Sequence, residues 1–172
     1  MKTAILQSNY IPWKGYFDLI NSVDVFVIYD SVQYTKNDWR NRNKIVSNKK
    51  PSWLTIPVRQ ESLEQSIRET KIANTNWSKK HWRTIQQSYA KTPYFDKYSQ
   101  KLESLYQNFE HEPFLSNINT ALIICLCEIL GIQTKIVQDD VFDLPDDRID
   151  KLIEICLQTG ASTYTSGPAA QN

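Results

Sequence analysis

Short apolar runs alternate with amphipathic stretches over much of the chain, and this alternation predicts an α/β protein. Residues 3–6 and 24–29 are apolar runs bounded by polar turns, a pattern typical of strands buried on both faces of a sheet. Residues 14–21 lie between them and have apolar side chains at helical spacing. A strand, a helix and a second strand within about thirty residues make a βαβ unit, whose two strands run parallel.

The middle of the chain departs from this alternation. Residues 43–46 and 53–58 have strand character and flank a turn of Ser, Asn, Lys and Pro, which predicts a β-hairpin. Residues 77–89 and 95–109 carry apolar stripes at helical spacing, so we expect two amphipathic helices there.

A third helix is predicted from about residue 117 to residue 130. Its sequence is apolar on almost every side, so we expect it at the centre of the fold. Ser116 is the predicted N-cap of this helix and Gly131 ends it. The three cysteines of the chain lie in apolar helical segments: Cys125, Cys127 and Cys156. Their spacing suits zinc poorly, so we expect buried, reduced thiols.

The parallel pattern then returns. A strand is expected at residues 134–138, a helix at 147–159 and a last short strand at 162–165. No repeat or long linker interrupts the sequence. We therefore predict a single α/β domain over residues 1–172, with a Rossmann-like parallel sheet and a β-hairpin and helical insertion, the helical part at about 77–130.

Composition and charge refine this picture. The chain of 172 residues has 41% hydrophobic and 23% charged residues, which is ordinary for a globular protein. A net charge of +1 gives no general attraction to nucleic acid or membrane. Residues 36–50 nevertheless hold six Lys or Arg and one acid, whereas residues 139–150 hold six Asp and one Arg. This distribution predicts one basic side that faces an anion.

The sequence also bears on location. No apolar run approaches the roughly 18 residues of a membrane span. The first residues lack the apolar core and cleavage site of a signal peptide. Together with the expected reduced cysteines, these features predict a cytoplasmic protein.

The loop after the first strand, at residues 7–17, is the first candidate site. It lies at the carboxyl edge of the predicted sheet, where α/β proteins bind ligands. The helix start that follows offers free backbone N–H groups to a phosphate or carboxylate, and Lys14 adds a full charge. The alternative is an ordinary loop whose aromatic side chains belong to the core. The binding candidates are Gln7, Asn9, Tyr10, Trp13, Lys14, Gly15 and Tyr16.

The loop after the second strand, at residues 30–44, should open onto the same crevice. Its arginines can grip phosphate or carboxylate with two parallel hydrogen bonds. Asp30 could bind a divalent cation, orient a sugar hydroxyl or act as a base. The alternatives are a basic, solvated loop or an RNA-binding surface, because arginine beside tryptophan can stack on bases. The binding candidates are Gln33, Lys36, Trp39, Arg40, Asn41, Arg42 and Asn43.

Three further residues are candidates. His81 lies near a helix start among basic and aromatic residues and could move protons. Ser166 and Gly167 follow the last predicted strand and would form the far lip of the crevice, although a simple turn is an equal alternative.

Four stretches of the sequence resemble the WbqC-like family of bacterial proteins, found among genes for O-antigen and other surface polysaccharides. They are residues 7–17, 30–45, 53–58 and the Ser-Gly-Pro-Ala-Ala ending at 166–170. Members usually continue beyond this ending, so the chain is expected to lack the C-terminal part of the family. The resemblance implies a role in modifying surface sugars, with transfer of glycine or a similar acyl group onto an amino sugar.

A more distant likeness concerns residues 11–16. They stand where nucleotidyltransferases and class I synthetases carry a His-x-Gly-His signature that binds ATP phosphates. Only Gly15 agrees, because Trp13 and Tyr16 stand at the two histidine positions. An aromatic ring cannot supply a cationic imidazolium, so other residues would have to hold the phosphates. The substitutes expected are Lys14, Arg40 and Arg42.

Two functions of different classes follow. The first is a transferase that modifies a nucleotide-linked amino sugar, with ATP and Mg²⁺ as candidate cofactors and Asp30 or His81 moving protons. The second is a non-catalytic module that binds a sugar nucleotide or serves as a scaffold for polysaccharide-biosynthesis enzymes. It is suggested by the lack of a recognisable catalytic triad or metal cluster. RNA binding is the less favoured third, no membrane partner is expected, and a homo-oligomer is left open.

Overall fold

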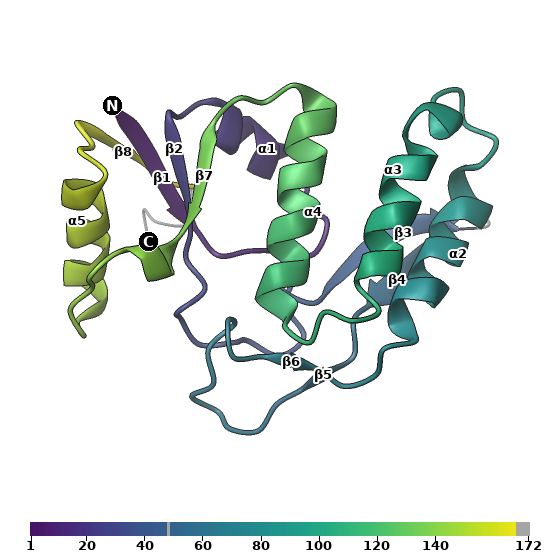
Figure 1. The fold of residues 1–172 in the computed structure, drawn as a ribbon, viewed down its shortest axis with the longest axis horizontal. Coiled ribbons are helices and arrows are strands. Elements are labelled where there is room, and N and C mark those ends of the chain that lie inside the picture. The colour runs from purple at the N-terminus through teal and green to yellow at the C-terminus, as the bar shows by residue number, and fades with distance from the viewer. Residues whose placement is uncertain (48, 168–172) are drawn as a thin grey trace.

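A parallel sheet of four strands forms one half of the molecule (Figure 1). The fold comes from a computed structural model that describes residues 1–47 and 49–167. The Pro-Ala-Ala part of the family-like ending, at 168–170, lies outside the described residues. The strand order is β7-β2-β1-β8, and every neighbouring pair is parallel. The strands are β1 (Lys2–Leu6), β2 (Val25–Ile28), β7 (Lys135–Gln138) and β8 (Thr163–Thr165). The predicted Rossmann-like α/β class is confirmed.

Helices cover both faces of this sheet. Helix α1 (Lys14–Asn21) and helix α4 (Leu115–Leu130) pack on one face, where Ile20 and Ile123 meet Phe26 in a fully buried cluster. Helix α5 (Arg148–Gln158) covers the other face and buries Ile155. Figure 1 shows the sheet between α5 on the left and α1 and α4 on the right. Burial on both faces explains why the central strands β1 and β2 are continuous apolar runs.

The winding of the sheet reverses beside β1. From β1 the chain passes through α1 to β2 and later reaches β7, always moving in one direction across the sheet. It then returns through α5 and adds β8 on the opposite side of β1. The boundary between β1 and β8 is therefore a topological switch point, and open α/β sheets bind ligands at the carboxyl ends of the strands there.

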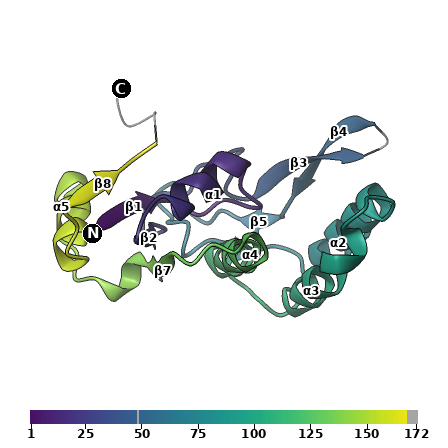
Figure 2. The same cartoon turned by 90° about the horizontal axis from the view of Figure 1, so that it is seen from above.

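The long insertion between β2 and β7 builds the other half of the molecule. It begins with an antiparallel hairpin that projects from the body in Figure 2. A pair of short antiparallel strands and two helices follow. The elements are β3 (Arg42–Ser47), β4 (Lys50–Thr55), β5 (Val58–Arg59), β6 (Lys71–Ile72), α2 (Trp77–Tyr89) and α3 (Phe95–Asn108).

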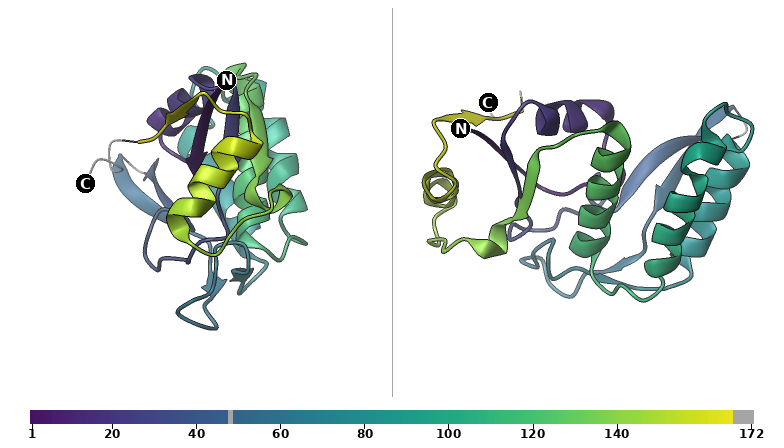
Figure 3. Two further views of the ribbon diagram at one scale, coloured as in Figure 1. Left: turned by 90° about the vertical axis from the view of Figure 1, so that its left-hand side faces the viewer. Right: turned by 45° about the horizontal axis from the view of Figure 1, so that its top comes forward.

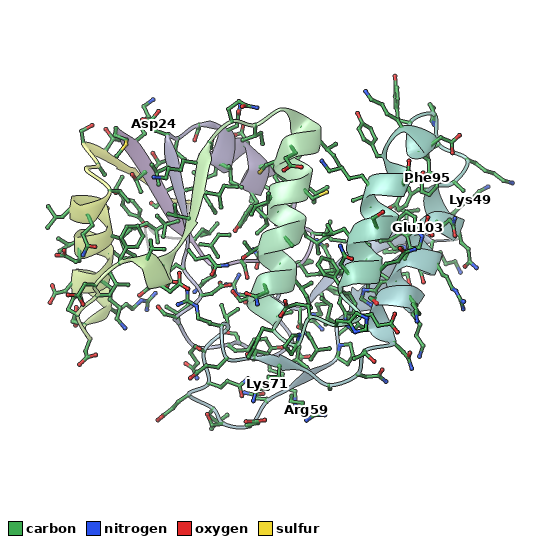
Figure 4. All side chains as sticks on the ribbon, viewed as in Figure 1. Asp24, Lys49, Arg59, Lys71, Phe95 and Glu103 are labelled. Carbon is green, nitrogen blue, oxygen red and sulfur yellow. The ribbon has the colours of Figure 1, made fainter. Side chains whose placement is uncertain are left out.

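A second hydrophobic core lies between the hairpin and helices α2, α3 and α4. Trp77, Tyr106 and Ile118 are among its buried members. Phe95 and Glu103 lie on the α3 side of this half in Figure 4. The Phe95 ring stacks on Trp82 with centroids 6.1 Å apart, and the Trp82 indole N–H donates to Glu103 over 2.9 Å. Helix α4 contributes to both cores, which explains its nearly continuous apolar surface.

Two local predictions differ from the structure, and two short elements were not predicted. Helix α4 begins one residue earlier than its predicted cap, so Ser116 lies in the first turn and its hydroxyl donates to Asp30 instead. The strand expected at 53–58 is two strands, because the chain leaves the hairpin after Thr55 and pairs again from Val58. A 3-10 turn (Asp139–Val141) and strand β6 were not predicted, because both are too short to show a period.

The burial of the three cysteines largely matches the prediction. Cys125 and Cys127 are buried, Cys156 is partly buried, and all three are free thiols. Burial raises the pKa of each thiol above its ordinary value. Thiols of this kind are unreactive.

Candidate functional site

The carboxyl edge of the sheet brings three predicted residues together. The Arg40 guanidinium donates to the Asn9 and Gln7 side-chain oxygens, so the loops after β1 and β2 meet through one arginine. A longer ion pair joins Arg40 to Asp38 at 3.6 Å. From α4, the Asn119 amide donates to the Arg40 carbonyl over 2.8 Å. The role of Asn119 could not be anticipated, because it is one of several polar residues in the first turns of α4 and helical spacing does not distinguish them.

A cavity of about 560 Å³ opens at the switch point. Figure 3 shows this end of the molecule, with β8 beside β1 and α5 across them. We name the space the switch-point cavity. Its polar lining comes from β1, the loop after β2, α5 and β8, and includes Gln7, Ser31, Gln33, Arg148, Lys151 and Tyr164. Asp146 also lines it. The sequence pattern did not single out Arg148 or Lys151, because both lie in a segment dominated by aspartates.

Asp30 is buried at this edge of the sheet, and each of its carboxylate oxygens accepts a hydrogen bond. One carboxylate oxygen accepts from the Ser8 backbone N–H over 2.8 Å, and the other accepts from the Ser116 hydroxyl over 2.5 Å. Burial raises the pKa of Asp30 above its ordinary value, although these hydrogen bonds oppose the rise. Asp30 is fully buried, so it could bind a cation or take a proton from a ligand only if the elements around it moved apart. Its geometry suits a residue that ties the ends of β1 and β2 to α4.

Asp139 is a second buried carboxylate at this edge. It follows β7 as Asp30 follows β2, and it accepts from the Ser31 backbone N–H over 3.0 Å and from the Arg68 guanidinium. Asp140 lies 3.7 Å from the same guanidinium. The strand-end position of Asp139 was a usable signal, but the surrounding acidic stretch hid it.

His81 and Tyr10 lie together in the second core, away from the switch-point cavity. The Tyr10 hydroxyl is 2.7 Å from His81 Nδ1 and 2.7 Å from the Tyr106 hydroxyl. His81 Nε2 is 3.2 Å from the Thr55 carbonyl, which can only accept, so Nε2 carries the proton and Nδ1 accepts from Tyr10. Burial lowers the pKa of His81 to about 4. The imidazole is therefore neutral at pH 7, and neither side chain is placed to touch a ligand at the sheet edge.

Trp13, Lys14 and Gly15 lie at the start of α1, on the side that faces α4 rather than the switch-point cavity. The Trp13 side chain is 67% exposed. Its ring lies directly on Gly15, where an added Cβ would stand 1.9 Å from a ring carbon. Gly15 therefore accommodates a neighbouring indole. Tyr16 is buried and donates from its hydroxyl to the Gln7 carbonyl over 3.0 Å.

Arg42 and Trp39 belong to the surface of the hairpin. The Arg42 guanidinium lies 4.5 Å from the centre of the Trp53 ring and donates to the Asn37 carbonyl. The Trp39 and Trp53 rings are 5.5 Å apart, and both side chains are exposed. The Arg42 guanidinium thus lies against Trp53 and Asn37 and does not line the switch-point cavity.

The side chains of the two asparagines in this loop donate hydrogen bonds to backbone carbonyls. The Asn41 amide donates to the Ile56 carbonyl over 2.9 Å. The Asn43 amide donates to the carbonyls of Tyr10, over 3.2 Å, and Ile11. Both side chains hold loop geometry.

The remaining candidates lie at the margin of the site. Gln33 lines the switch-point cavity and donates to the Leu63 carbonyl over 2.5 Å. Ser166 and Gly167 follow β8 at the same edge of the sheet as Gln7, since Thr165 pairs with Ala4. Lys36 is exposed in the loop and does not line the cavity.

Two kinds of structure are absent from residues 1–47 and 49–167. No group of three or more His, Cys, Asp or Glu side chains is arranged to hold a metal ion. Within the same ranges, every helix is too short or too polar to cross a bilayer.

Comparison with known proteins identifies relatives of the chain. Residues 7–172 match the model of the family described as "WbqC-like protein family". The chain is also 43% identical over 172 residues to "Uncharacterized protein Rv1507c" of Mycobacterium tuberculosis (strain ATCC 25618 / H37Rv), an alignment that covers 99% of this chain and 74% of that protein. No solved structure matches the chain.

Proposed function

The chain belongs to the WbqC-like protein family, and from that premise we propose that it is a cytoplasmic transferase of surface-polysaccharide synthesis. It would bind the nucleotide part of a nucleotide-linked amino sugar in the switch-point cavity. The observation that carries the proposal is the pair of α5 cations, Arg148 and Lys151, which line this cavity together with Gln7 of the β1 end.

The lining supplies the chemistry that such a ligand needs. Arg148 and Lys151 can bind phosphate oxygens, because a guanidinium or ammonium forms the stronger, charge-assisted hydrogen bonds. Gln7 and Gln33 can donate to and accept from sugar hydroxyls. Tyr164 of β8 offers an aromatic face for the base. A volume of about 560 Å³ is within the usual range of small-molecule sites.

The transfer step needs a base. Acylation of an amino sugar forms an amide bond from the amine nitrogen to the acyl carbon, expels the leaving group of the activated acyl donor and releases one proton. Asp30 and His81 are buried and hydrogen-bonded, so neither is free to take this proton. Asp146 lines the cavity and is the carboxylate that we assign to the task.

A non-catalytic sugar-nucleotide module is the second candidate. The observation that favours it is the engagement of Asp30 with Ser8 and Ser116 and of His81 with Tyr10 and Thr55. The two candidates share the binding site and differ only in turnover.

The first experiment measures binding by calorimetry, with nucleoside diphosphates and amino-sugar nucleotides as ligands. The double variant Arg148→Gln/Lys151→Gln should bind at least tenfold more weakly than the native chain, since each charge-assisted contact contributes about 1.5–3 kcal/mol. The matched control is Lys80→Gln, which removes an exposed α2 charge far from the cavity and should leave the affinity unchanged. Native affinity in the double variant would contradict the assignment of the site.

The second experiment separates enzyme from module. The chain is incubated with an amino-sugar nucleotide and either glycyl adenylate, an activated donor whose leaving group is AMP, or glycine, ATP and Mg²⁺, and the products are analysed by mass spectrometry. A sugar nucleotide heavier by one glycyl group indicates the transferase, and Asp146→Asn should reduce its formation while binding persists. Binding without any product indicates the module.

A further inference from the structure

We infer that copies of this chain associate head to tail, through two complementary surfaces at opposite ends of the molecule. One surface is the outer side of helix α5, and the other is the outer face of the β3–β4 hairpin. Figures 1 and 2 show the two elements far apart, so one copy cannot bring its own surfaces together. The inference does not depend on the proposed function.

The outer side of α5 is an apolar stripe with an acidic border. Ile149, Ile153 and Leu157 follow one another every four residues, so they share one side of the helix, and they are 51–68% exposed. Asp150 and Glu154 each stand three residues before a member of this stripe and are its neighbours on the helix surface. Exposed apolar patches with a polar rim mark interaction sites. We name this surface the α5 stripe.

The two cations of α5 lie on another side of the helix. Arg148 and Lys151 line the switch-point cavity, and Ile155 is buried against the sheet. Asp143 and Asp147, in the segment that leads into α5, are exposed and add negative charge at the N-terminal end of the helix. The surroundings of the α5 stripe are therefore negative.

The outer face of the hairpin carries the opposite charge. Arg42, Lys44 and Val46 alternate along β3 and so lie on one face, whereas Ile45 between them packs against the second core. The Arg42 guanidinium and the Lys44 ammonium lie 4.5 and 4.8 Å from the centre of the Trp53 ring. Two cations therefore flank an indole on this face.

Exposed apolar surface lies among these cations. Val46, Trp53 and Trp39 are 44–58% exposed, and the two indole rings are 5.5 Å apart. Tryptophan and arginine are enriched at protein interfaces and among the residues that contribute most to binding. Asp38 is the one acid of residues 36–50, and it pairs with Arg40 at 3.6 Å. This surface, which we name the hairpin face, is apolar and positively charged.

Charge complementarity selects which surfaces meet. Two α5 stripes would bring acid against acid, and two hairpin faces would bring cation against cation, so either symmetric pairing is disfavoured. A stripe on a hairpin face instead brings aliphatic side chains to indoles and carboxylates to Arg42 and Lys44. Every copy carries both surfaces, so a second copy supplies a partner of the required charge. Contact between two different surfaces builds a ring where the rotation closes and a filament where it does not.

Sedimentation equilibrium of the native chain tests the self-association. The weight-average mass should rise with concentration between about 10 μM and 1 mM, the affinity range of weak contacts, and fall with added salt, which screens exposed charges. A chain that stays monomeric over this range would overturn the proposal. Association that salt strengthens would overturn the role of charge.

Two variants, measured alone and mixed, identify the surfaces. Ile153→Arg places a cation in the α5 stripe, and Lys44→Thr/Val46→Thr removes a cation and an apolar side chain from the hairpin face while keeping strand propensity. Each should be monomeric alone, because half of the contact is lost. Mixed in equal amounts they should form a dimer and nothing larger. The hairpin face of the first variant then binds the α5 stripe of the second, and no other intact pair remains.

The matched control is Leu63→Arg, which places the same cation at an aliphatic residue that is 77% exposed between β5 and β6. It should associate as the native chain does. Dimers of Ile153→Arg alone would show that hairpin faces pair with each other, and dimers of Lys44→Thr/Val46→Thr alone would show that α5 stripes do. Either result would overturn the head-to-tail contact, as would a mixture that stays monomeric.

Discussion

Burial lowers the pKa of His81, a residue that its sequence context suggested was free to titrate. Its basic and aromatic sequence context suggested a proton carrier, but both ring nitrogens have partners in the second core. The same burial raises the pKa values of Tyr10 and Tyr106 above their ordinary value. The Tyr106–Tyr10–His81 chain, with the Tyr10 hydroxyl at its centre, is therefore neutral and hydrogen-bonded, which is how a packed core accommodates polar groups.

This burial makes stability depend on pH. The folded His81 has a pKa of about 4, whereas the unfolded residue titrates near 6.5. Between these values the unfolded chain binds a proton that the folded chain does not, so stability is full above about pH 6.5 and falls as the pH drops toward 4. The loss should approach about 3 kcal/mol. Urea unfolding from pH 4.5 to 7.5 should show a shallower slope for His81→Gln than for the native chain. The exposed His111→Gln is the control and should keep the native slope.

At the scale of elements, the sequence predicted the positions of loops better than the partners of side chains. The sequence alone predicted that the loops after β1 and β2 would meet, because the carboxyl ends of neighbouring parallel strands lie at the same edge of a sheet. Arg40 meets Gln7 and Asn9 there. Arg42, two residues later on the next strand, stacks on Trp53 instead. Such differences depend on tertiary packing, which no local pattern encodes.

The same limit applies to polar residues within apolar elements. Ser116 had the features of a helix cap and was predicted as one, but Asp30 offers its hydroxyl a buried acceptor. Asn119 donates to both the Ser8 hydroxyl and the Arg40 carbonyl. Helical spacing predicted that α4 would be buried, yet it could not show which of its polar residues join the ends of the strands.

Asp30 joins the ends of three elements, and two substitutions at this position test that role. Asp30→Ala removes the acceptor for the Ser8 N–H and the Ser116 hydroxyl and should destabilise the fold by roughly 2–4 kcal/mol, since each buried donor left unpaired costs about 1–3 kcal/mol. Asp30→Asn keeps an acceptor and the shape while removing a charge that burial disfavours, so it should cost much less. Urea unfolding followed by circular dichroism measures both. Equal losses in the two variants would show that the charge, rather than the hydrogen bonds, holds the elements together.

At the scale of the whole molecule, α4 is the element that the two halves share. Figures 1 and 2 show it between the sheet and the α2–α3 pair. Its neighbouring residues Leu122 and Ile123 point to different cores: Leu122 is buried in the second core, and Ile123 is buried against the sheet. A helix used in this way couples the two halves, and the predicted single domain over residues 1–172 follows if this coupling makes unfolding cooperative.

The matched pair Leu122→Ala and Ile123→Ala tests that coupling. Each removes a fully buried aliphatic side chain and should lower the free energy of unfolding by about 2–5 kcal/mol. Four of the five tryptophans, Trp39, Trp53, Trp77 and Trp82, lie in the insertion between β2 and β7, so fluorescence reports mainly on the insertion while circular dichroism reports on the whole molecule.

If the chain is one cooperative unit, both probes should give coincident urea transitions in both variants, because losing either core releases α4 from the other. If the two halves unfold separately instead, the two variants should differ. Leu122→Ala would then shift the fluorescence transition to lower urea ahead of circular dichroism, whereas Ile123→Ala would leave fluorescence at its native midpoint. That outcome would make the insertion a unit that unfolds by itself.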